Sequence, residues 1–260
     1  MPRVVRSAGP TAPVIAHVPH ASTRIPADVR AELLLSDDEL ADELLRLTDH
    51  YTDELFAGLA ELGATLFVND LSRLVFDPER FLDDSAEPMA PRGQGVVYWQ
   101  GTQGQVMRKA SSELRQQRVA ELYRPYHAAL DGLVGGVLEA AGECLVIDCH
   151  SFPTEPLPSE IDQAPDRPDI CIGTDPVHTP AALSAAFESS FAAEGLQVRR
   201  DAPFAGTFVP SGYYGTDERV HSVMIEVRRG LYMDEATGAR LPSFADVRAA
   251  ITRAVSAALG

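Results

Sequence analysis

The chain has 260 residues, of which 45% are hydrophobic and 23% charged, proportions typical of a globular protein with a substantial core. Lysine and arginine number 22 against 38 acidic residues, so the net charge of −16 excludes nucleic acid and anionic membrane surfaces as main partners. A small anionic substrate is still compatible, because a local arginine cluster can reverse the field inside one cleft.

The periodicity of apolar residues divides the chain into alternating strands and helices. In chain order it predicts a strand at 14–18, a helix at 36–63, a strand at 64–69, a helix at 106–141, strands at 143–150 and 169–172, a helix at 179–194, strands at 197–200 and 220–227, and a helix at 243–259. Pro125 lies inside a predicted helix and indicates a kink or break there. Residues 70–106 are rich in Pro, Gly, Asp and Arg, which predicts an irregular and functional segment.

This alternation predicts the α/β fold class, with a mainly parallel or mixed sheet and helices on both faces. No internal repeat or low-complexity linker interrupts the pattern, so residues 1–260 are predicted to form a single domain. No segment reaches the roughly 18 apolar residues of a membrane span. Residues 1–13 lack the apolar centre of a signal peptide, and three cysteines are too few for a disulfide framework. We therefore expect a cytoplasmic protein with reduced thiols and no membrane partner; a homo-oligomer is compatible with the sequence.

Polar side chains follow the ends of the predicted strands, where ligands gather in folds of this class. His20 follows the first strand and His150 ends the central one. Two imidazoles suit zinc or a similar metal, and a carboxylate commonly completes such a set. Asp49 and Asp53 are both candidates because one helical turn separates them, whereas Asp148 is better placed to orient the imidazole of His150.

The remaining histidines are interpreted as structural. His17 is expected to be an ordinary strand residue, His127 a helix-packing residue, His178 a solvated loop residue and His221 a residue at a strand start.

Glu226 lies in an apolar strand, where a carboxylate is costly unless it is paired or functional. Burial would raise its pKa and suit a general base, while an ion pair with Arg228 is the structural alternative. Arg73 and Arg80 follow the second strand, and Arg228 and Arg229 end the last one. Guanidinium groups bind carboxylates and stabilise oxyanions, although the same arginines can simply neutralise neighbouring acids.

Seven short motifs occur in an order that resembles the N-formylglutamate amidohydrolase family. They are VPHASTRIP at 18–26, TDHYTDELF at 48–56, SRLVFD at 72–77, YRPYH at 123–127, DCHS at 148–151, PFAG at 203–206 and IEVRRGLYM at 225–233. The motifs extend over nearly the whole chain.

The resemblance implies a zinc-exopeptidase-like α/β domain that hydrolyses the amide of a small anionic N-acyl amino acid such as N-formylglutamate. Carried over by position, it implies His20, Asp49 and His150 as ligands of zinc or another divalent metal, Glu226 as general base, Arg73 as a catalytic arginine, and Arg80 as a substrate contact. Arg228 is predicted to bind substrate beside them.

Two departures from the family pattern leave the substrate open. Glu79 precedes Arg80 where the family usually has an Asn-Arg pair, and residues 206–212 lack an arginine that the family tends to carry. The alternative is therefore a non-catalytic or altered-specificity member of the same fold that binds carboxylates. A metal-free thiol hydrolase using Cys149 is disfavoured, because residue 149 should point to the opposite strand face from residues 148 and 150.

Overall fold

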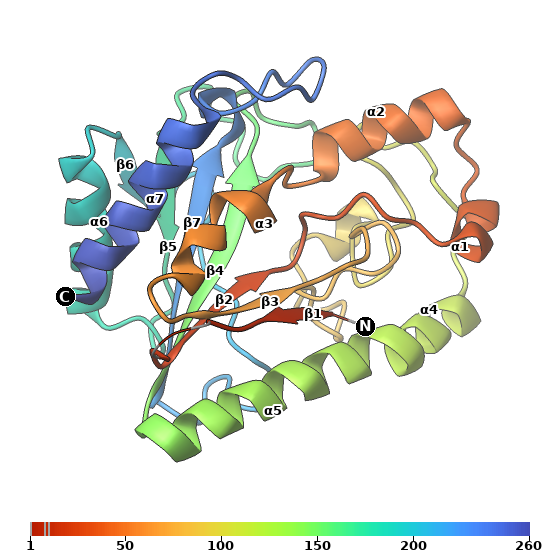
Figure 1. Cartoon of the computed structure of the whole chain (residues 1–260). Coiled ribbons are helices and arrows are strands. Elements are labelled where there is room, and N and C mark those ends of the chain that lie inside the picture. Colours follow the sequence, from red (N-terminus) through yellow and green to blue (C-terminus); the bar gives the residue numbers. More distant parts are fainter. Residues whose placement is uncertain (1, 8, 10) are drawn as a thin grey trace.

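A mixed seven-stranded sheet forms the centre of the computed structural model, which describes residues 2–7, 9 and 11–260 (Figure 1). The strands are β1 (Arg3–Val5), β2 (Val14–Val18), β3 (Thr65–Val68), β4 (Cys144–Phe152), β5 (Ile170–Gly173), β6 (Val198–Arg200) and β7 (Val220–Arg228). Their order is β1-β3-β2-β4-β7-β5-β6, and only the β1–β3 and β5–β7 pairs are antiparallel among these strands. All six predicted strands are confirmed, and the short edge strand β1 was not predicted.

Helices cover both faces of this sheet, which confirms the predicted fold class (Figure 1). One face packs against α3 (Thr52–Leu55), the 3₁₀ turn η1 (Ala57–Ala60), α6 (Ala181–Ala193) and α7 (Phe244–Leu259). The other packs against α5 (Arg124–Ala141). Alternate residues of β2 divide between these two cores, since Ala16 lies in the first and Ile15 in the second. The remaining helical segments are α1 (Ala27–Glu32), α2 (Asp37–Leu47), η2 (Ala90–Arg92), α4 (Ser112–Arg118), the π turn η3 (Val119–Tyr123) and η4 (Arg229–Leu231).

The predicted helix over 36–63 is broken, and this prediction was wrong in its middle. The helix α2 begins with a capping box between Ser36 and Glu39, as the acidic start suggested, but it ends at Leu47. Tyr51 then adopts a left-handed conformation, with φ 67°, before α3 begins. The backbone N–H of Asp49 donates to the carbonyl of His20 at 3.1 Å. A long-range hydrogen bond thus replaces a helical one and ties the break to the end of β2.

The predicted helix over 106–141 begins later than expected, at Ser112. Residues 119–123 form a π turn that ends two residues before Pro125, so the expected irregularity takes that form. Residues 70–106 are largely irregular, with the short 3₁₀ turn η2 inside them.

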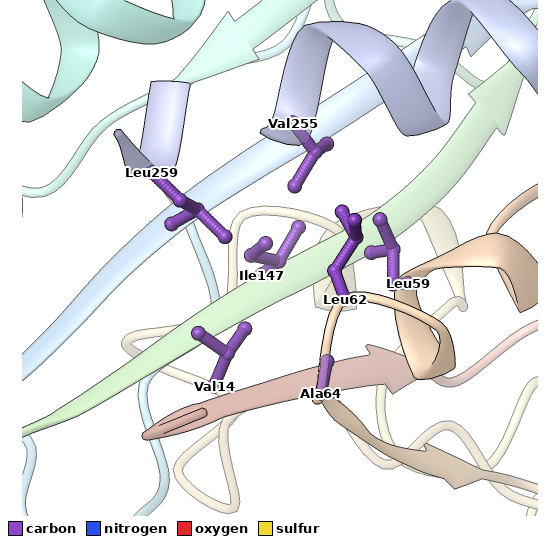
Figure 2. A pocket seen from close by; sticks show the side chains of 7 residues that line it. All are labelled: Val14, Leu59, Leu62, Ala64, Ile147, Val255 and Leu259. Carbon is purple, nitrogen blue, oxygen red and sulfur yellow. The ribbon is translucent and has the colours of Figure 1, made fainter. Parts of the chain in front are cut away.

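An apolar crevice lies between α7, η1 and the sheet near the start of β2 (Figure 2). Its walls are Val14, Leu59, Leu62, Ala64, Ile147, Val255 and Leu259. The lining is entirely aliphatic, so it offers no group that orients a polar substrate. No helix in the described part of the chain is long and apolar enough to cross a membrane.

Gly173, the last residue of β5, leaves no room for a side chain. A Cβ atom there would lie 2.0 Å from the carbonyl oxygen of Gly206 and 2.5 Å from the methyl carbon of Met224. The first neighbour is backbone, so relief requires the strand end to move. We expect Gly173→Ala to lower the free energy of unfolding by about 1–3 kcal/mol in urea titrations. Gly132→Ala on α5, where the Cβ would meet nothing within 4 Å, should not destabilise the protein.

Candidate active site

Three of the predicted site residues converge at the carboxyl ends of β2 and β4. The rings of His20 and His150 lie 5.2 Å apart between their centroids. An oxygen of Asp49, from the break after α2, lies 2.9 Å from Nδ1 of His150 and 3.7 Å from Nδ1 of His20. All three side chains are buried, with at most 5% of each residue exposed. The chain thus places two imidazoles and a carboxylate together out of bulk water.

The break in the helix separates the two aspartates that the sequence left as alternatives. Asp49 faces the imidazoles, whereas Asp53 lies in α3 and accepts a hydrogen bond from Arg3 at 3.1 Å. Their spacing is helical in sequence, but their side chains do not share a helix face. Of the two, Asp49 is the one beside the histidines.

The two ring nitrogens of His20 differ in their hydrogen-bond partners. Its Nε2 lies 2.9 Å from an oxygen of Asp77, while the buried Nδ1 has no hydrogen-bond partner among the described residues. Carboxylate oxygens of Asp49 and Glu79 lie 3.7 and 3.6 Å from this Nδ1. An imidazole whose far nitrogen is fixed by a carboxylate is the usual arrangement of a metal-ligating histidine.

Arg73 and Arg80 surround Asp77, directly behind His20. Arg73 donates to Asp77 at 2.8 Å and lies over the ring of Tyr98, and the Nε of Arg80 lies 3.4 Å from the same carboxylate. Burial alone would raise the pKa of Asp77, but the charges of His20 and these arginines hold it well below its usual value. The arginine side chains are still 13% and 21% exposed, so neither is fully withdrawn from water.

Glu226 lies beside His150, since the two residues are opposite each other in the parallel β4–β7 pair. Its Oε2 has no hydrogen-bond partner among the described residues, and burial raises its pKa to about 8. The alternative ion pair with Arg228 is not formed, because Arg228 binds Asp169 instead. The described contacts of Arg228 do not reach the two histidines.

Arg229 contacts the site where Arg228 does not. Its guanidinium donates to Asp49 at 2.9 Å and to the carbonyl oxygen of Ser151 at 3.0 Å. Burial alone would raise the pKa of Asp49, but the hydrogen bond with His150, the nearby imidazole of His20 and the charge of Arg229 hold it well below its usual value. Strand-end reasoning grouped Arg229 with the other arginines but did not select it as a site residue.

Glu79 was missed by sequence reasoning, although it lies among three histidines. Its oxygens lie 3.1 Å from His150, 3.5 Å from His17 and 3.6 Å from His20. Burial alone would lower the pKa of His150, but the charges of Glu79 and Asp148 raise it well above its usual value. The departure from the Asn-Arg pattern was the available signal for Glu79.

His17 lies in strand β2 as predicted, and its side chain makes specific polar contacts there. It is fully buried, 3.0 Å from Asp148 through Nδ1 and 2.7 Å from the hydroxyl of Tyr126 through Nε2. His178 is also buried rather than solvated, accepting a hydrogen bond from the N–H of Gly215. His127 packs on Tyr123 with ring centroids 4.1 Å apart, as its predicted helix-packing role requires.

Cys149 points away from this site. Its side chain belongs to the core on the α3, α6 and α7 face, and burial raises the pKa of the thiol well above its usual value. A neutral thiol on the opposite face of β4 is a poor nucleophile, which disfavours the thiol-hydrolase alternative.

A cleft of about 470 Å³ adjoins the site. The end of α2, the loop after β4 and the segment after β7 form its walls, and its lining includes Arg46, Thr154, Leu157, Arg229 and Glu235. Arg229 joins the cleft to Asp49, because the same guanidinium lines the one and contacts the other. The volume is that of a site for a small molecule.

The chain is similar in sequence and in structure to known proteins. Residues 12–233 match the sequence model of the N-formylglutamate amidohydrolase family. An N-formylglutamate deformylase of Pseudomonas aeruginosa is 28% identical over 230 residues, covering 86% of this chain and 83% of the relative. One from Pseudomonas putida is 27% identical over 233 residues, covering 86% and 82%. The crystal structure of N-formylglutamate amidohydrolase from Ralstonia eutropha JMP134 superposes with a TM-score of 0.87 at 26% identity, covering 99% of this chain and 97% of that one.

Proposed function

Because the chain belongs to the N-formylglutamate amidohydrolase family, we propose that it hydrolyses the amide of a small N-acyl amino acid such as N-formylglutamate. The observation that carries the proposal is the buried Nδ1 of His20, which has no hydrogen-bond partner within the described part of the chain and faces carboxylate oxygens of Asp49 and Glu79. A buried polar atom of this kind is costly unless something binds it. A divalent cation is the binder that suits an imidazole among carboxylates.

The donor set fits zinc or another divalent metal. His20, Asp49 and His150 would hold it, and Glu79 offers a further oxygen close to both imidazoles. Asp77 and Arg229 would orient these groups from behind. Such a cation lowers the pKa of a bound water toward neutrality and polarises an amide carbonyl.

The protein's own groups would manage the protons and the developing charge. Glu226 takes a proton from the attacking water and delivers it to the departing amine, so the carboxylate is regenerated in each turnover. Burial raises the pKa of Glu226, which brings its basicity closer to that needed for proton transfer than an exposed carboxylate would have. Arg73 would stabilise negative charge on the former carbonyl oxygen, and Arg80 would hold a substrate carboxylate.

The cleft beside Arg229 would receive the rest of the substrate. Arg46 is its other cation, and its side chain is 37% exposed, so it can pair with an anionic group of the substrate.

The cysteines of the described chain are free and buried, in keeping with the predicted cytoplasmic location.

Altered specificity is a second candidate, favoured by Glu79. A carboxylate one residue before Arg80 repels a substrate carboxylate that an asparagine would tolerate. Under this alternative the reaction is the same and the acylated amino acid differs. Comparing kcat/KM for N-formylglutamate and for N-formyl derivatives of neutral amino acids would distinguish a preference for N-formylglutamate from altered specificity.

Chelation is expected to abolish release of formate from N-formylglutamate, and zinc to restore it, because the proposed cation activates the water. His150→Ala should lower zinc content measured by mass spectrometry and remove activity together. His221→Ala, at the far end of β7, is the matched control and should change neither. Equal zinc content in the His150→Ala variant and the wild type would reject the ligand assignment.

A further inference from the structure

We propose that His17, Asp148 and Glu79 hold a second divalent cation next to the first, with the Glu79 carboxylate shared between the two. This inference concerns metal stoichiometry and stands apart from the choice of substrate.

The three donor atoms have the spacing of a coordination shell. Nδ1 of His17 lies 3.0 Å from Oδ1 of Asp148 and 3.5 Å from Oε1 of Glu79. Oxygen donors of the two carboxylates lie within 4.8 Å of each other and of the imidazole. Ligands at 2.0–2.2 Å from a tetrahedral zinc are themselves about 3.3–3.6 Å apart; the 3.5 Å separation falls in that range and the 3.0 Å separation lies slightly below it.

Hydrogen bonds alone stabilise the side chains of His17, Asp148 and Glu79 less well than a bound cation would. Nδ1 of His17 carries at most one proton, yet two carboxylate oxygens approach it. Neither Asp148 nor Glu79 has an arginine or lysine partner among the described ion pairs, since the nearby arginines bind Asp77 and Asp49. Their remaining neighbour is Nε2 of His150, 3.0 Å from Asp148 and 3.1 Å from Glu79, so among the described ion pairs only imidazoles face these two largely buried carboxylates. A divalent ion would offset the cost of burying both charges.

The surrounding contacts hold the donors in place. Nε2 of His17 lies 2.7 Å from the hydroxyl of Tyr126, which leaves Nδ1 for the cation. The ring stacks on Phe208 at 4.5 Å between centroids, and the N–H of Phe208 donates to the other oxygen of Asp148 at 3.0 Å. His17 and Asp148 therefore each have their second polar atom engaged.

Glu79 connects this group to the proposed first site. Its Oε1 faces His17, and its Oε2 lies 3.6 Å from the free Nδ1 of His20. One carboxylate that presents an oxygen to each of two ions is a typical bridge in two-metal hydrolases, where the ions lie about 3.5–4 Å apart.

Metal titration of the chelated full-length protein tests the proposal. With Mn²⁺ or Zn²⁺ alone as probe, the wild type should bind two ions per chain by calorimetry and mass spectrometry. His17→Asn, whose amide can still donate to Asp148, should bind one, and so should Asp148→Asn. The matched control His221→Asn should bind two. One ion in the wild type, or two in folded His17→Asn, would overturn the proposal.

Electron paramagnetic resonance of the Mn²⁺-loaded protein tests the bridge. The wild type should give an exchange-coupled signal, and His17→Asn the six-line spectrum of an isolated ion. An uncoupled six-line spectrum from the wild type at saturating Mn²⁺ would refute a shared carboxylate. Hydrolysis of N-formylglutamate bears only on the proposed function, so the two ideas fail on different measurements.

Discussion

Replacing Glu226 by glutamine is expected to lower kcat for N-formylglutamate about 10²–10⁴-fold, the usual contribution of a general base. Glutamine has the same shape but cannot accept a proton from water. The position supports this role, because Glu226 is buried opposite His150 and one of its oxygens has no hydrogen-bond partner among the described residues. Steady-state kinetics should show the loss in kcat, with KM and zinc content close to those of the wild type.

Glu43→Gln provides the matched control. Glu43 is also a fully buried carboxylate, but it accepts hydrogen bonds from Thr102 and Gln105 rather than facing the histidines. Its replacement should leave kcat nearly unchanged, which separates loss of a base from loss of a buried charge. A Glu226→Gln enzyme that retains most of its kcat would require a different proton acceptor.

The strands and their ends were predictable, because the strands of a sheet covered by helices on both faces are buried. Such strands occur in the sequence as continuous apolar runs. The run before His150 fixed β4, and the run before His20 fixed β2. Carboxyl ends of parallel strands meet at one edge of a sheet, so both histidines were expected there, and β2 does pair in parallel with β4. The pairing of Glu226 with His150 also requires the strand order, which periodicity does not give and the structure supplies by placing β7 next to β4.

The rest of the site depends on contacts that periodicity does not encode. The helix break at Asp49 is stabilised by the carbonyl of His20, which is remote in sequence, so local propensity alone predicts a continuous helix. Glu79 lies in an irregular segment whose path is set by the contacts of Asp77 with Tyr98 and its arginines. His17 resembled a core residue because its partner, Tyr126, belongs to a distant helix.

Asp49→Asn is expected to weaken zinc binding at least 10–100-fold, the loss seen when a group that orients a metal ligand is removed. The amide keeps the shape of the side chain but loses the charge that faces His20, His150 and Arg229. Arg229 would be left as a buried cation without its carboxylate, which costs about 3–5 kcal/mol of stability. Competition titration with a chromophoric chelator measures the affinity, and urea unfolding of the metal-free protein measures the stability.

Asp53→Asn distinguishes the geometry found here from a continuous helix. In a continuous helix the two aspartates would share a face, and both substitutions would act on the same ion. In the broken helix, Asp53 pairs with the half-exposed Arg3, so its replacement should cost only about 0–1 kcal/mol and leave zinc affinity unchanged. Equal losses of zinc affinity in both variants would contradict the break. A loss confined to Asp49→Asn would show that the interruption of the helix positions the acidic ligand.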